Sequence, residues 1–129
     1  MERTLIIIKP DGVRRKLVDK IIERYEEKGL KVLTLKKMSA SKELLKKHYS
    51  THIGKKFYPW LERFMLSDEV VAFVVEGKDA IKRARDITGA TDPSKAKKGT
   101  IRRDFGIDST EKADKEKRAI ENLVHASGT

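Results

Sequence analysis

The sequence predicts an α+β sandwich, in which helices cover a four-stranded, mostly antiparallel sheet. Short apolar runs of strand length alternate along the chain with longer amphipathic stretches. The order is strand, helix, strand, two helices, strand, helix, a long loop and a final strand, which suits this architecture. The 129 residues contain no internal repeat and no linker, so we expect a single domain over residues 1–129 with one core.

The predicted strands differ in how plainly the sequence marks them. Residues 4–8 form a continuous apolar run, and Pro10 ends it because proline cannot donate to a sheet ladder. Residues 70–75 are apolar throughout and predict the most buried strand. Residues 30–38 alternate only partly between apolar and polar side chains, and residues 119–124 predict a weak final strand.

Helices are expected where apolar side chains recur on one helical face. In residues 13–28 that face carries Leu17, Ile21 and Tyr25, and Gly29 is a natural C-terminal stop. Since the helices share this pattern, we expect them to cover one face of the sheet. The further predicted helices are residues 41–49, 57–65 and 78–88.

The long stretch from residue 89 to residue 118 has little periodicity and predicts a loop. Its first half, up to Phe105, is rich in Gly, Thr, Pro and Arg, as binding loops are. Its second half, residues 108–118, is nearly all charged or small. We interpret that half as a solvated insertion with at most a short surface helix.

Composition narrows the function classes. The net charge is +10, and although most of the lysines and glutamates are expected to form a solvated surface, the excess favours anionic partners. Only 6% of residues are aromatic, so a nucleic-acid partner is unlikely for want of stacking platforms. The absence of Cys excludes disulfides and thiolate sites. There is no apolar stretch of about 18 residues and the N-terminus leads directly into a strand, so we expect no membrane anchor and a cytoplasmic protein.

One histidine and several cations form the candidate reactive group. His125 is preceded by apolar residues, while Lys9, Arg85 and Arg102 lie in three motifs far upstream. Neighbouring cations disfavour protonation of an imidazole and attract anions, so His125 is poorly placed as a general base. It is well placed as a nucleophile towards phosphate, whose charge the cations would neutralise.

Six motifs in a fixed order carry a resemblance to a known family. They are Lys9-Pro10-Asp11-Gly12, His48-Tyr49, Phe57 before Met65, Gly89-Ala90-Thr91-Asp92-Pro93, Gly99-Thr100-Ile101-Arg102 and Asn122-Leu123-Val124-His125-Ala126-Ser127. The chain resembles the nucleoside diphosphate kinases over essentially its whole length. The resemblance implies a ferredoxin-like fold, a homo-oligomer and a Mg²⁺-dependent ping-pong reaction. In that reaction the γ-phosphate of a nucleoside triphosphate passes to a nucleoside diphosphate through a phosphohistidine.

The resemblance also implies a role for each matching residue at the phosphate end of the nucleotide. His125 would be the catalytic nucleophile, and Lys9, Arg85 and Arg102 would hold the phosphates. Thr91 would add a hydroxyl donor to the same phosphates. Mg²⁺ would be carried by the nucleotide phosphates rather than by protein ligands.

At the nucleoside end, Asn122 would bond a sugar hydroxyl through its amide. Phe57 would stack on the base without reading its hydrogen-bonding edge, which predicts indifference to base identity. Tyr49 and Ser127 match supporting positions, and that of Tyr49 lies beside the reacting phosphate.

The sequence departs from the family in the stretch between Phe105 and Asn122, which is longer than usual, and at its end. The family continues after this serine with an Asp and a helix supplying a Glu that orients the histidine, whereas this sequence ends at Thr129. We therefore expect a detectable but depressed rate.

Two alternatives stay open at this point. The first is a catalytically impaired family member that binds nucleotides. The missing orienting Glu is the feature that discriminates it from an active kinase. The second is a basic nucleic-acid-binding domain, which has no need of the pocket-like set Lys9, Arg85, Arg102 and Asn122.

Overall fold

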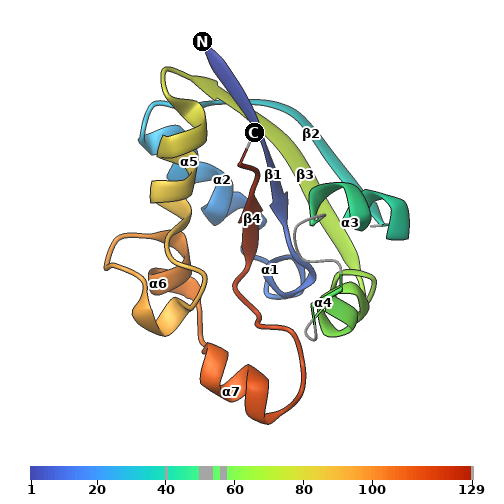
Figure 1. The fold of residues 1–129 in the computed structure, drawn as a ribbon. Coiled ribbons are helices and arrows are strands. Elements are labelled where there is room, and N and C mark those ends of the chain that lie inside the picture. The colour runs from blue at the N-terminus through green and yellow to red at the C-terminus, as the bar shows by residue number, and fades with distance from the viewer. Residues whose placement is uncertain (40, 50–53, 56–57, 129) are drawn as a thin grey trace.

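A computed structural model describes residues 1–39, 41–49, 54–55 and 58–128. Within these residues, the strands β1 (Glu2–Ile8), β2 (Lys31–Ser39), β3 (Glu69–Gly77) and β4 (Val124–Ala126) form one sheet. Its order is β2-β3-β1-β4, and all three neighbouring pairs are antiparallel (Figure 1). The predicted α+β class and antiparallel sheet are confirmed.

Seven α-helices and one 3₁₀ helix surround the sheet in the described part of the chain. None of them is long and apolar enough to cross a membrane. They are α1 (Pro10–Arg14), α2 (Val18–Glu27), α3 (Lys42–His48), α4 (Tyr58–Met65), α5 (Ala80–Thr88), η2 (Pro93–Lys95), α6 (Ile101–Phe105) and α7 (Thr110–Lys115).

The main core lies between one face of the sheet and helices α2 and α5. Ile6 and Ile8 of β1 and Phe73 of β3 point to this face, as the alternation of a strand requires. Tyr25 of α2 meets Phe73 edge-on, with ring centroids 5.9 Å apart, and its hydroxyl shares a 2.7 Å hydrogen bond with that of Thr88 in α5. Each such fully buried side chain contributes roughly 1.5–3 kcal/mol.

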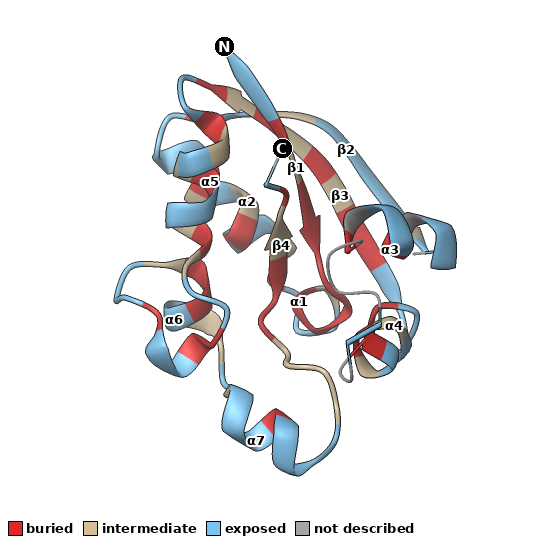
Figure 2. Ribbon diagram, in the orientation of Figure 1, coloured by how far each residue is buried: buried red, intermediate tan, exposed pale blue. Residues whose placement is uncertain are grey.

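A second core cluster covers part of the opposite face, so the prediction that helices cover only one face is wrong. The residue between the two inward isoleucines, Ile7, packs with Leu45 of α3 and with Leu61 and Met65 of α4. The buried residues of α3 and α4 accordingly face β1 and β3 (Figure 2). The apolar run of β1 is continuous because both of its faces are covered at this end.

The predicted single helix over residues 13–28 is two helices, α1 and α2. Lys16 adopts a left-handed conformation (φ 58°), and the Leu17 amide donates to the Gly12 carbonyl at 3.0 Å. The apolar helical face begins only at Leu17. This pattern therefore predicts α2 but does not indicate that α1 is a separate helix.

The predicted final strand at residues 119–124 is also wrong, because β4 is Val124–Ala126. Leu123 is left-handed (φ 73°), and both of its backbone polar groups are bound by the turn after β1 rather than by a ladder. Strand pairing therefore starts one residue later, and His125 lies opposite Ile7 of β1.

Candidate active site

A cavity of about 530 Å³ lies beside β4, and most of the predicted site residues line it. Those residues are Lys9, Tyr49, Arg85, Thr91, Arg102, Asn122 and His125. Ser127 does not belong to this lining: its amide and carbonyl extend the pairing to β1, with Leu5 and with the Thr4 hydroxyl. Phe57 lies outside the described residues, as does His52.

Lys9 follows β1 directly and is only 4% exposed. Its ammonium donates to Asn122 Oδ1 at 2.7 Å. Burial and, to a smaller extent, the nearby Arg102 guanidinium lower the pKa of Lys9, and although Asp11 opposes the shift the pKa is about 7. An anion bound beside such an amine would favour its charged form.

Arg102 of α6 is the second buried cation. Its guanidinium donates to three backbone carbonyls, those of Asn122 (3.2 Å), Gly89 (3.0 Å) and Val124 (2.6 Å). Burial lowers the pKa of Arg102, although a guanidinium stays charged at neutral pH. The three bonds tie α6 to the end of α5 and to β4, so the cation is fixed in place before any ligand binds.

Asn122 connects Lys9 to the loop that carries Thr91. Besides accepting from Lys9, its amide nitrogen donates to the Thr91 carbonyl at 2.9 Å. Thr91 itself is exposed, as is Arg85 in the last turn of α5, so these two side chains form the open part of the site.

His125 is half-buried on β4 and stacks obliquely with Tyr49 of α3's C-terminal end. Their ring centroids are 4.7 Å apart, with the planes tilted by 43°. Burial raises the pKa of the Tyr49 hydroxyl, so it stays neutral. The tyrosine therefore restricts the imidazole's movement without adding a charge.

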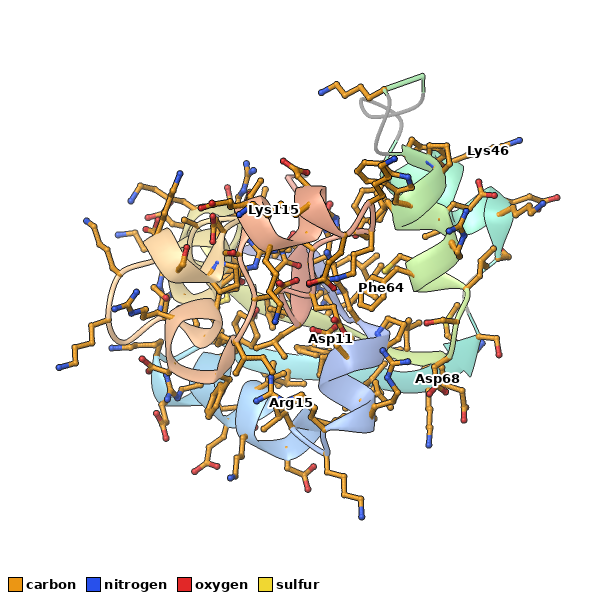
Figure 3. The ribbon with its side chains drawn as sticks, turned by 90° about the horizontal axis from the view of Figure 1, so that it is seen from below. Asp11, Arg15, Lys46, Phe64, Asp68 and Lys115 are labelled. Carbon is orange, nitrogen blue, oxygen red and sulfur yellow. The ribbon has the colours of Figure 1, made fainter. Side chains whose placement is uncertain are left out.

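Asp11 is a functional candidate that the sequence reasoning treated only as part of a turn. Its carboxylate is 4% exposed, and Oδ2 accepts the Leu123 amide at 3.0 Å, while the Leu123 carbonyl accepts the Lys9 amide at 2.7 Å. Burial raises the pKa of Asp11, and the Lys9 ammonium opposes this. Gly12 allows the approach, since a Cβ there would lie 3.1 Å from the Leu123 carbonyl oxygen. Along the chain, His125 lies two residues after Leu123. Asp11 lies near the middle of the molecule in the view from below (Figure 3).

The cavity also has two sides that the sequence did not indicate. Trp60 and Leu61 of α4 line it, and so does the segment around α7, which had been interpreted as a solvated insertion. The sequence allowed a short surface helix here but gave no indication of its contact with the cavity.

Comparison with known proteins supports one family throughout. The sequence model of the nucleoside diphosphate kinase family matches residues 2–129. The nucleoside diphosphate kinase of Desulforamulus reducens is 50% identical over 108 residues, covering 84% of this chain and 72% of the relative. That of Picosynechococcus is 52% identical over 127 residues, covering 98% of this chain and 78% of the relative.

The chain belongs to the nucleoside diphosphate kinase family.

A solved structure gives the same result for the fold. The nucleoside diphosphate kinase of Borrelia burgdorferi, a transition-state mimic with bound vanadate and ADP, superposes with a TM-score of 0.93 at 37% identity, over 99% of this chain and 79% of that one. The ferredoxin-like fold is thereby confirmed. As a nucleoside diphosphate kinase, the protein is a phosphotransferase that moves phosphate between nucleotides.

Proposed function

We propose that His125 is the nucleophile of this nucleoside diphosphate kinase. A ring nitrogen attacks the γ-phosphorus, the new N–P bond forms, and the bond from that phosphorus to the bridging oxygen breaks, so that the diphosphate leaves with the electron pair. A second nucleoside diphosphate then attacks the phosphohistidine in the reverse sense. The observation that carries this proposal is that His125 shares one cavity with the buried cations Lys9 and Arg102.

The cations act by holding the transferring group. The transition state spreads charge over the equatorial oxygens of phosphorus, so positioned positive charge supplies most of the catalysis. Lys9 and Arg102 are buried and held by hydrogen bonds, whereas Arg85 is exposed and is assigned to the phosphates from the solvent side. Three of the five Arg102 N–H donors bind carbonyls in the described structure, which leaves two for phosphate oxygens.

The remaining predicted residues support binding. The Asn122 amide keeps a second lone pair on its oxygen and a second hydrogen on its nitrogen, and we assign one of these to a sugar hydroxyl. Thr91 supplies its hydroxyl to the phosphates, Tyr49 restrains the imidazole, and Ser127 anchors the end of β4. Phe57 is assigned to the face of the base by its place in the family motif.

Mg²⁺ is proposed to enter as part of the nucleotide substrate. Within the described residues no three carboxylate or imidazole side chains gather as a metal cage, and the cavity that holds His125 is also lined by the cations Lys9, Arg85 and Arg102. A divalent ion suits this site once the nucleotide phosphates supply its oxygen ligands.

We further propose that the chain is a single domain and that it forms a homo-oligomer in the cytoplasm. Strand β2 lies at one edge of the sheet and carries Leu35, which is 54% exposed. An exposed strand edge with an apolar side chain is a natural contact for a second copy.

Isotope exchange tests the ping-pong step. Labelled ADP should exchange into ATP in the presence of Mg²⁺ without any second nucleotide, because the phosphohistidine forms and reverts by itself. Exchange that requires a second nucleoside diphosphate would contradict a covalent intermediate.

A further inference from the structure

The segment of residues 108–121, which contains the predicted insertion at residues 108–118, is docked on the body of the protein. The Asp92 carboxylate, in the loop that also carries Thr91, accepts the Thr110 amide at the start of α7 at 3.1 Å. Ala113 of α7 is 2% exposed. Figure 1 shows α7 beyond the end of β4, with the chain returning from it to that strand.

Asp108 joins the two ends of this segment. Its carboxylate receives both terminal nitrogens of Arg118, at 2.6 and 2.9 Å, and Oδ2 also accepts the Glu121 amide at 2.8 Å. The Asp108 side chain is 4% exposed. Because Glu121 directly precedes Asn122, this carboxylate also holds the backbone next to a residue of the candidate site.

The inner side of the segment forms one wall of the cavity. Its lining residues are Thr110, Ala113, Asp114, Arg118, Ala119 and Ile120. Ala119 packs against the core cluster that contains Leu61 of α4, another residue of the cavity lining. The wall therefore contacts the core cluster beneath α4, and the wall and α4 both border the cavity.

The charged groups of the cavity lining differ between its segments. Lys9 and Arg102, which line the cavity together with His125, are cations that attract phosphate. The wall offers apolar side chains and the Asp114 carboxylate, which repels phosphate, and its one cation, Arg118, is paired with Asp108. The nucleoside is the part of a nucleotide that such a surface accommodates.

We propose that residues 108–121 form the nucleoside-binding wall of this site and that Asp108 is its positioning residue. The proposal rests on the proposed function in taking this cavity as the nucleotide site, but it does not depend on which side chain is phosphorylated. It makes the insertion a determinant of nucleotide affinity.

Asp108→Asn tests the role of the carboxylate that joins the two ends of the segment, and Glu111→Gln is the matched control. The control removes an ion pair with Lys115 on the same helix, where both side chains are at least 75% exposed. Since Asn cannot keep both charged hydrogen bonds to Arg118, the wall should be held less firmly, and we expect Asp108→Asn to raise the KM for nucleotides about tenfold. The kcat should change less than about twofold, because binding and not the transferring group is affected. Asp108→Glu, which keeps the carboxylate, should recover part of the loss. A KM no higher than that of Glu111→Gln would overturn the proposal.

Amide hydrogen exchange tests the wall in the unaltered protein. Saturating ADP should slow exchange over residues 110–121, and it should do so equally in His125→Ala. Unchanged exchange there, with protection confined to the ends of β1 and β4, would contradict the wall. Protection in both proteins together with undiminished turnover of His125→Ala would instead contradict only the nucleophile.

Discussion

The protonation state of Lys9 should depend on whether a ligand is bound. Its ammonium is buried, and burial together with Arg102 lowers its pKa to about 7, so we expect part of the free protein to carry a neutral amine at neutral pH. A bound phosphate favours the charged form and raises that pKa again. Binding should therefore be accompanied by proton uptake.

Calorimetry in two buffers of different ionisation enthalpy measures this uptake. At pH 7.5 the wild-type protein should take up more protons with ADP than Lys9→Arg, whose guanidinium stays charged. The ADP affinity of the wild type should fall as pH rises from 6 to 9, and that of Lys9→Arg should fall less. Equal proton uptake by the two proteins would show that Lys9 does not titrate here.

Asp11 holds a strained residue just before the nucleophile. A left-handed Leu123 costs of order 1–3 kcal/mol, and the Asp11 carboxylate is one of the two groups that fix it. We expect Asp11→Ala to lower kcat by at least about tenfold through misplacement of His125, with a smaller effect on KM. Asp11→Asn keeps an oxygen for the Leu123 amide and should recover much of the rate. Steady-state kinetics on the two variants would contradict this role if Asn were as slow as Ala.

The segment carrying α7 has its own pH dependence. Burial alone would raise the pKa of Asp108, but the Arg118 guanidinium and the Glu121 amide lower it to about 2, from an ordinary value of 3.8. A lowered pKa means stabilisation that is complete above pH 4 and disappears as pH falls towards 2. Asp108→Asn should therefore unfold more easily than wild type at pH 7, by about 1–3 kcal/mol.

Thermal unfolding between pH 7 and pH 2 checks this expectation. The difference in stability between wild type and Asp108→Asn should shrink as the pH drops below 4. Glu111→Gln should match the wild type throughout. A difference that is independent of pH would show that the Asp108 carboxylate is not the stabilising group.

Elements with a local pattern could be predicted from the sequence. The apolar runs of β1 and β3 and the amphipathic α5 appear close to where they were expected, because each buries its own side chains against the sheet. Strand β4 was misplaced, and the docking of the largely solvated α7 beside the cavity was not predicted, because distant groups decide both. Asp11 fixes the turn at Leu123, and Asp92 holds the start of α7. The candidate site residues were proposed from the order of the motifs, whereas Asp11 and the segment around α7 became candidates only once the fold was known.

The charge of the whole molecule should speed the arrival of nucleotides. The net charge of +10 attracts anions over a Debye length, which is about 30 Å at 0.01 M salt and about 8 Å at 0.15 M. Trp60 is the chain's only tryptophan and lines the cavity, so its fluorescence should report binding. In stopped-flow measurements the association rate of ADP should fall several-fold over this salt range, and the dissociation rate should change less. An association rate that ignores salt would contradict electrostatic steering.

Phosphorylation of His125 tests the central claim most directly. Protein incubated with γ-labelled ATP and Mg²⁺, then quenched in alkali, should carry an acid-labile, base-stable label, and His125→Ala should carry none while still binding ADP. Undiminished labelling of His125→Ala would contradict the account.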